Sequence, residues 1–243
     1  MNDQADPVDV SLIVPVGRRQ ADPAQLFAEY RAGLDALGCH YEMIFVLDGP
    51  NEKFAAGLKA LSAGPQRITV VSLTRVFGEA TAIMAGFEQA KGQVIVTLPA
   101  YFQVDAMELP KLVGALDKCD LAIAHRWPRA GGVFERLRRG AFHGLLKAVT
   151  GLRFRDLGCG ARALDRRVLE EIQLYGDQHR FLPVLADRKG FKIAEIDVRQ
   201  SPKDHHEGFY EPRVYTRGLL DIFTVFFLVR FTKKPLRFFG MIG

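Results

Sequence analysis

Short apolar runs alternate with amphipathic helical patterns along the first part of the chain. Residues 10–16, VSLIVPV, form a continuous and largely β-branched apolar run, which is typical of a strand buried on both faces. The next segment, AQLFAEYRAGLDALG, has apolar positions at helical spacing. The same order recurs at residues 41–49 and 68–73, each followed by a helical pattern, and residues 93–98 add a further strand, QVIVTL. This alternation predicts an α/β fold with a doubly wound, mostly parallel sheet and helices on both faces.

The turns that follow these apolar runs are where we expect a ligand. Open parallel sheets bind their ligands beyond the carboxyl ends of the strands. In this chain the turns are residues 15–18, 47–52, 73–77 and 99–103. The sequence therefore predicts a functional site that is shared among these turns.

The second half of the chain has a different character. Residues 121–125 predict one more strand, and residues 191–201 alternate like a half-buried strand. Between them, residues 126–167 contain eleven arginines and lysines but only three acidic residues. A solvated helix face would mix charges of both signs at spacing i,i+4. The excess of one sign therefore predicts that this half binds an anion.

The last part of the chain has a pattern of its own. Residues 219–229, LLDIFTVFFLV, are strongly apolar and have arginines or lysines on both sides. The run is too short to cross a bilayer, which takes about 20 apolar residues. It suits either a helix that lies in the membrane interface or a buried terminal helix. We therefore predict a main domain at residues 1–212 and an amphipathic juxtamembrane segment at residues 213–243.

Composition and charge narrow the classes of function. The net charge of +5 and the isoelectric point of about 9.2 favour anionic partners such as nucleotides, phosphates and acidic lipids. Nucleic acid is not an expected partner, because the arginines lack interleaved aromatic residues and no DNA-reading motif is present. Three cysteines without paired spacing predict neither disulfides nor a zinc site, and they fit a reducing cytosol. The polar, acidic N-terminus has no signal-peptide pattern.

Six sequence blocks, in chain order, carry a resemblance to a known family. They are SLIVPV, IFVLDGPNE, TRVFGEATAIMAGFEQAKGQVIVTL, DLGCGARALDRRVLEEI, HRFLPVLADRKGFKIAEIDVRQSP and RGLLDIFTVFFLVRFTKKPLRFFGMIG. Together they resemble the family-2 inverting glycosyltransferases with a GT-A fold, in the branch of dolichyl-phosphate mannose synthase and the bacterial polyprenyl-phosphate glycosyltransferases. The resemblance implies a GT-A fold over nearly the whole chain, ending in juxtamembrane helices.

The resemblance also implies an activity and its partners. It implies transfer of a hexose from a nucleotide-diphosphate sugar to a membrane-associated acceptor such as a polyprenyl phosphate. We expect this reaction at the cytoplasmic face of the membrane, with the protein attached peripherally, or integrally if transmembrane helices follow residue 243. Homo-oligomer formation is left open.

On the donor side the chain departs from the family's pattern. The family stabilises the leaving diphosphate with a divalent cation held by an Asp-x-Asp motif, and in register those two positions are Pro99 and Tyr101. Neither side chain is a ligand for Mg²⁺ or Mn²⁺, which take carboxylate, carbonyl and water oxygens. We therefore predict no metal ligands. The expected replacements are Arg18, Arg19 and Arg75, because guanidinium groups bind phosphate as forked donors.

The other donor-binding positions follow from the resemblance. Asp48 is what remains of the family's aspartate pair, since Leu47 takes the first place, and Val76 replaces an asparagine. Asp105 and Glu108 lie just past the turn and offer an alternative metal site, although a glutamate at a helix start is also explained by the helix dipole. The predicted donor-binding set is Pro15, Arg18, Asp48, Arg75, Gly78, Tyr101 and Gln103.

On the acceptor side the resemblance is better preserved. Asp156 occupies the position of a residue near the acceptor and is the candidate general base; alternatively, it is a loop carboxylate paired with Arg153 or Arg155. His205 and His206 either contact phosphate in place of a lysine that the family carries, or are simply solvated. The predicted phosphate-binding arginines on this side are Arg138, Arg139 and Arg162.

Two classes of function remain open from the sequence. The first is an active glycosyltransferase that works without a metal. The second is a catalytically silent GT-A domain that binds a nucleotide, a lipid phosphate or a partner enzyme. The lost Asp-x-Asp motif favours the silent domain, whereas the retained acceptor-side blocks and the arginines near the donor turns favour the active enzyme.

Overall fold

A computed structural model describes residues 8–61, 68–128, 140, 144, 151–152, 154–176 and 178–204. The chain divides into two compact units, one made of residues 1–128 and 156–204 and the other of residues 129–155 and 205–243. Every strand and helix with described bounds lies in the first unit. The predicted juxtamembrane segment at residues 213–243 lies outside the described residues, so the boundary at residue 212 stays a prediction.

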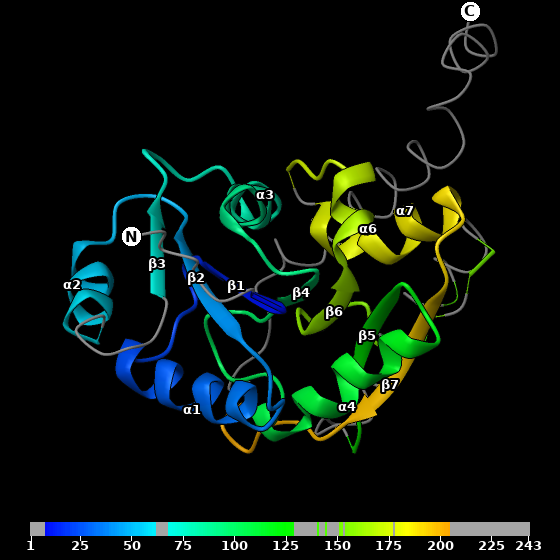
Figure 1. Ribbon diagram of the computed structural model, residues 1–243. Coiled ribbons are helices and arrows are strands. Elements are labelled where there is room, and N and C mark those ends of the chain that lie inside the picture. The colour runs from blue at the N-terminus through cyan, green and yellow to red at the C-terminus, as the bar shows by residue number, and fades with distance from the viewer. Residues whose placement is uncertain are drawn as a thin grey trace, which may run out of the picture. The chain divides into compact units, whose positions relative to one another are not determined.

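Seven strands form one sheet at the centre of the first unit (Figure 1). In spatial order they are β3 (Ile68–Ser72), β2 (Tyr41–Leu47), β1 (Val10–Val16), β4 (Val94–Thr97), β6 (Arg162–Asp165), β5 (Leu121–Arg126) and β7 (Ile193–Val198). Neighbouring strands are parallel except at β6, which runs antiparallel to both β4 and β5. The prediction of an α/β fold with a mostly parallel sheet is confirmed.

Helices cover both faces of the sheet (Figure 1). One face carries α1 (Pro23–Asp35), α2 (Glu52–Leu61) and α4 (Leu109–Gly114), with the 3-10 turns η1 (Ala106–Glu108) and η2 (Ala115–Asp117) on either side of α4. The opposite face carries α3 (Glu79–Gln89), α6 (Arg166–Glu171) and α7 (Leu182–Lys189), and η3 (Gln178–Phe181) leads directly into α7.

The alternation of side chains along β1 decides which helices meet which face. All seven residues of β1 are buried, as its continuous apolar run predicts. Leu12 and Val14 share a core with apolar residues of α1, α2 and α4. Ile13 points the other way and packs against α3, where Gly86 allows a close approach: a Cβ there would lie 2.6 Å from the Ile13 Cγ2 atom.

The structure differs from the sequence prediction at the strand ends and at β6. The expected strands at residues 68–73, 93–98 and 191–201 are longer than β3, β4 and β7. Their last residues belong to the segments that follow the strands, and residues 93 and 191–192 precede β4 and β7. The pattern did not predict β6, which is four residues long and pairs with strands distant in the chain. Among the described residues, no helix has the length and apolar character needed to span a bilayer.

Candidate active site

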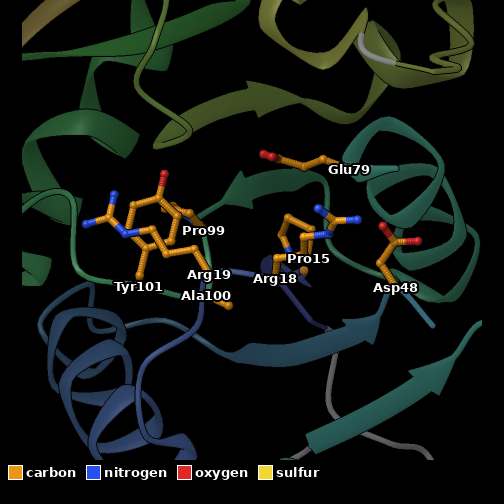
Figure 2. Close-up of a pocket in the computed structure, with 9 residues that line it drawn as sticks. Pro15, Arg18, Arg19, Asp48, Glu79, Pro99, Ala100 and Tyr101 are labelled. Carbon is orange, nitrogen blue, oxygen red and sulfur yellow. The ribbon is translucent and has the colours of Figure 1, made fainter. Parts of the chain in front are cut away.

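A pocket of about 230 Å³ opens at the carboxyl ends of β1, β2 and β4 (Figure 2). This is the edge of the sheet at which the sequence predicted a ligand. The pocket is lined by Pro15, Arg18, Asp48 and Tyr101 from the predicted donor-binding set, together with Gly17, Arg19, Glu79, Pro99 and Ala100. The fold therefore brings residues from separate turns into one site.

Asp48 fixes one wall of this pocket. It directly follows β2, and its carboxylate accepts the backbone N–H of Phe77 at 2.7 Å and that of Gly78 at 3.0 Å. Gly78 has a φ of 103°, a conformation that suits glycine, and it leads directly into α3. Arg75, on the same loop, lies 4.8 Å from the centre of the Phe77 ring. Asp48 thus joins the end of β2 to the loop before α3, while Arg75 is not among the residues that line the pocket.

The turn after β4 is organised around a tyrosine ring. The hydroxyl of Tyr30 on α1 donates to the carbonyl of Pro99, and the Tyr101 hydroxyl accepts from Gln103 Nε2 at 2.7 Å. The Gln103 Oε1 atom in turn accepts the backbone N–H of Gly160 at 2.8 Å. Burial raises the pKa of Tyr101, so its hydroxyl is a neutral phenol at pH 7. Gln103 therefore links the Tyr101 hydroxyl to the backbone of Gly160, and it is not among the residues that line the pocket.

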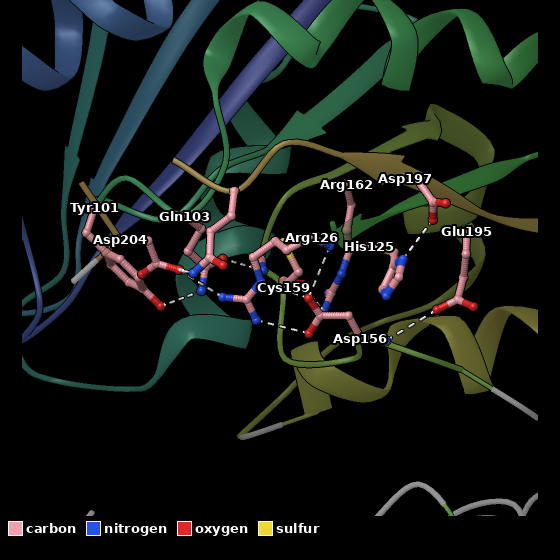
Figure 3. Close-up of polar contacts among 12 residues, drawn as sticks. Tyr101, Gln103, His125, Arg126, Asp156, Cys159, Arg162, Glu195, Asp197 and Asp204 are labelled. Atoms are coloured by element: carbon pink, nitrogen blue, oxygen red, sulfur yellow. Dashed lines mark hydrogen bonds and ion pairs between the residues drawn. The ribbon is translucent and has the colours of Figure 1, made fainter. Parts of the chain in front are cut away.

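Arg19 lies over Tyr101 and contacts Asp204, the first of three alternating charges, Asp204, Arg126 and Asp156, that Figure 3 shows. Its guanidinium carbon lies 3.8 Å from the centre of the Tyr101 ring, and its Nη2 atom lies 3.2 Å from Asp204 Oδ1. The other carboxylate oxygen of Asp204 accepts from Arg126 Nη1 at 3.1 Å. Arg126 then holds Asp156 through two bonds, Nε to Oδ2 at 2.7 Å and Nη2 to Oδ1 at 3.0 Å.

Asp156 is therefore an ion-paired carboxylate in this structure. It is 2% exposed, and its bidentate partner Arg126 comes from the end of β5 rather than from its own loop. Burial alone would lower the pKa of Arg126, but the hydrogen bonds that its guanidinium donates to Asp156 and the nearby negative charges outweigh this effect and raise it. The ion-paired alternative for Asp156 was anticipated, with Arg153 or Arg155 as the expected partners; Arg126 was not.

Arg162 lies behind the pocket wall. It is 2% exposed, and its guanidinium donates to the backbone carbonyls of His179 and Cys159. The His179 Nε2 atom lies 3.3 Å from the carboxylate of Glu79, which lines the pocket. Burial, and then the nearby Arg162, hold the pKa of His179 well below its usual range, so the imidazole is neutral. This arrangement does not fit the predicted contact of Arg162 with a lipid phosphate.

The other predicted residues divide into two groups. Arg138, Arg139, His205 and His206 lie outside the described residues. Asp105 and Glu108, the alternative metal ligands, are both paired with Arg199, at 3.3 Å and 2.7 Å, and Asp105 also caps η1. The sequence did not predict the roles of Asp204, Glu79 and His179, or the pairing of Arg126 with Asp156. For Arg126 one signal was available: it directly follows the predicted strand at residues 121–125.

Residues 11–173 match the family model described as Glycosyl transferase family 2. The chain belongs to this family. It is a glycosyltransferase, and the resemblance found in its sequence blocks is confirmed.

Curated relatives of this glycosyltransferase match it over almost its whole length. Undecaprenyl-phosphate 4-deoxy-4-formamido-L-arabinose transferase from Shewanella sediminis is 31% identical over 238 residues, covering 96% of this chain and 70% of the relative. Dodecaprenyl-phosphate galacturonate synthase from Rhizobium johnstonii is 27% identical over 248 residues, covering 100% of this chain and 73% of the relative.

Solved structures place the fold among the GT-A glycosyltransferases. A mannosyltransferase from Pyrobaculum calidifontis in complex with GDP-Man and Mn²⁺ has a TM-score of 0.64 and 17% identity; the match covers 92% of this chain but only 64% of that one, less than two thirds. Glucosyl-3-phosphoglycerate synthase from Mycobacterium tuberculosis, in complex with Mn²⁺, UDP-glucose and phosphoglyceric acid, has a TM-score of 0.68 and 17% identity. That match covers 90% of this chain and 79% of the synthase. The predicted GT-A fold is confirmed.

The described residues of this chain offer no suitable ligand set for the Mn²⁺ ion that both of these structures contain. The turn after β4 presents Pro99, Ala100 and Tyr101 to the pocket, none of which carries a carboxylate. No group of three or more His, Cys, Asp or Glu side chains that could hold a metal ion occurs among the described residues. The pocket-lining residues of this turn therefore do not fit a divalent cation.

Proposed function

We propose that this glycosyltransferase moves a sugar from a nucleotide-diphosphate sugar to a polyprenyl phosphate. The acceptor class is supported by the relatives named above, whose names specify undecaprenyl and dodecaprenyl phosphates. The observation that carries the donor half is the pocket at the ends of β1, β2 and β4, where Arg18 and Arg19 accompany Asp48. Two guanidinium groups that line one pocket suit a diphosphate, because each can donate a pair of N–H bonds to phosphate oxygens.

The proposed reaction is a direct displacement at the anomeric carbon. An oxygen of the acceptor phosphate forms the new bond to that carbon from the side opposite the leaving group. The bond from the anomeric carbon to the diphosphate oxygen breaks, and its electron pair leaves with the nucleoside diphosphate. The configuration at the anomeric carbon is therefore inverted, and the positive side chains offset the charge that develops on the diphosphate.

In this reaction the acceptor needs no general base. A phosphate monoester has a second pKa of about 6 and is already anionic at neutral pH. Asp156, the candidate base, is buried and holds Arg126 through two hydrogen bonds. We therefore assign Asp156 a positioning role: it orients Arg126, which also contacts Asp204 and through it Arg19.

The test is a transfer assay with the full chain. The protein is incubated with polyprenyl phosphate in detergent micelles and with labelled sugars of uridine, guanosine, cytidine or thymidine diphosphate. Transfer of label to the lipid with one of these donors is expected. A folded protein that binds a nucleotide sugar but transfers nothing would instead support the silent GT-A domain. Absence of both binding and transfer would contradict the proposal altogether.

A further inference from the structure

We propose that the donor diphosphate is neutralised by Arg19, mounted on Tyr101 and oriented by Asp204, in the place where related enzymes use a divalent cation. The inference rests on the proposed function, since it concerns how the same pocket holds a nucleotide diphosphate. It starts from a disagreement: the fold is shared with Mn²⁺-containing structures, yet the turn after β4 lacks the ligands for such an ion.

The turn after β4 offers an aromatic ring where a metal ligand is expected. Tyr101 stands at one of the two motif positions, and its hydroxyl accepts a hydrogen bond from Gln103. Because burial favours its neutral form, the phenol does not supply the anionic oxygen that Mg²⁺ or Mn²⁺ prefers. What the ring does supply is a flat π face, and Arg19 lies on it at 3.8 Å. At this motif position Tyr101 therefore supports the Arg19 cation instead of binding a metal ion.

Arg19 is held in place before a ligand binds. Two contacts hold the guanidinium, one with the Tyr101 ring and one with the Asp204 carboxylate. The side chain is still 41% exposed and lines the pocket, so its charge can reach a bound phosphate. A guanidinium that is already oriented loses less conformational freedom when a phosphate binds than a mobile side chain would.

Two carboxylates, Asp48 and Glu79, also line the pocket. Asp48 accepts the N–H groups of Phe77 and Gly78, and Glu79 lies against His179. Both carboxylates thus have roles in the pocket wall. Figure 2 shows Arg18 on the Asp48 side of the pocket and Arg19 on the opposite side over Tyr101, so that the two cations flank the space between them.

The experiment is calorimetric titration of the full chain with UDP, GDP, CDP and dTDP. Each titration is made with excess Mg²⁺ or Mn²⁺ and again with a chelator. We expect one nucleotide to bind with a Kd that changes by less than about twofold on chelation, since the arginine charge is permanent. Arg19→Gln should weaken that binding by about 10- to 100-fold, the worth of one charge-assisted contact.

Two further variants test whether the effect belongs to Arg19 and its support. Arg31→Gln removes another exposed, ion-paired arginine, 45% exposed and paired with Asp35 on α1, and should leave the Kd unchanged. Tyr101→Leu keeps apolar bulk but removes the π face beneath Arg19, so it should weaken binding in the same direction as Arg19→Gln. Circular dichroism and thermal melting establish that each variant is folded.

The outcomes separate this inference from the proposed function. Binding that disappears on chelation and returns with Mg²⁺ or Mn²⁺ would overturn the arginine site while leaving the glycosyltransferase proposal intact. An unchanged Kd for a folded Arg19→Gln variant would also overturn it. Failure of every nucleotide to bind under both conditions would overturn the donor half of the proposed function together with this inference.

Discussion

At the scale of single residues, the site depends on charges that alternate through the interior of the first unit. Arg19, Asp204, Arg126 and Asp156 follow one another, and the last three have side chains exposed by 6% or less. A charge that is buried this deeply is stable only with its partner in place, because desolvation penalises an unpaired ion by several kcal/mol. Each member of the series therefore holds the next in position, from the loop before β6 to the donor pocket.

Asp156→Asn tests this dependence. The substitution leaves the buried Arg126 with Asp204 but without its bidentate partner. We expect the free energy of unfolding to fall by about 3–5 kcal/mol, as for other buried pairs that lose one member. Sugar transfer should fall as well, because Arg126 and Asp204 would no longer be held in register. Denaturant unfolding and the lipid-transfer assay measure the two effects.

The control for this prediction is Asp35→Asn, which disrupts an exposed pair with Arg31 at 3.4 Å and keeps a side-chain oxygen that can accept from the Tyr41 hydroxyl. A surface pair of this kind contributes less than about 1 kcal/mol. If Asp156→Asn costs no more than Asp35→Asn, the buried pair does not stabilise the fold. If Asp156→Asn transfers sugar at the normal rate, the positioning role of Asp156 is wrong.

At the scale of elements, the donor pocket depends on how closely α3 lies against β1 and β2. The helix begins after the Gly78 loop that Asp48 holds, and Glu79 in its first turn lines the pocket. Gly86 lies about two helical turns after Glu79 and packs against Ile13 of β1 and Val46 of β2. The packing of one helix on two strands therefore sets the position of a pocket wall.

Gly86→Ala should disturb this contact. A Cβ at this position would lie 2.6 Å from Ile13 Cγ2 and 3.0 Å from Val46 Cγ2, so the helix or the strands must shift. We expect a loss of about 1–3 kcal/mol in the free energy of unfolding, the usual cost of overpacking a core. Weaker nucleotide binding should accompany it. Thermal melting and calorimetry measure both.

The matched control is Gly114→Ala at the end of α4, where nothing lies within 4 Å of the added Cβ and the backbone is already helical, with φ at −62°. This variant should gain up to about 1 kcal/mol, because alanine favours a helix over glycine. Equal effects of the two substitutions would show that packing at Gly86 is not the reason for any loss.

At the scale of the whole molecule, a polyprenyl phosphate acceptor requires the enzyme to reach a membrane. Residues 213–243 combine an apolar run with arginines and lysines on both sides. We propose that this segment attaches the protein to the cytoplasmic face of the membrane, with its apolar side chains in the interface and its cations on anionic headgroups.

This attachment predicts a dependence on lipid charge. The full chain should float with vesicles that contain anionic phospholipid and should associate less with neutral vesicles or at raised salt, because salt screens headgroup attraction. Lys233→Gln combined with Lys234→Gln should weaken the association, at roughly 1 kcal/mol per charge removed. A chain that stays in solution with every type of vesicle would contradict the proposal.

The sequence by itself determined the strands of the sheet other than β6, and the edge at which the site lies. Continuous apolar runs such as residues 10–16, alternating with helical patterns, are enough to predict parallel strands, because local periodicity reports which faces are buried. The turns after those strands then meet at one edge of the sheet. The loss of carboxylates at Pro99 and Tyr101 could also be recognised from residue types alone, since the chemistry of a ligand belongs to its side chain.

Only the tertiary structure decided which charges are paired and which face the pocket. Arg126, Asp156 and Asp204 are separated by tens of residues, yet they form one hydrogen-bonded series. The same applies to Arg162, whose sequence position suggests a phosphate contact but which is buried against the backbone of His179. Burial and long-range pairing depend on how β4, β5, β6 and β7 lie side by side, and local periodicity carries no information about that arrangement.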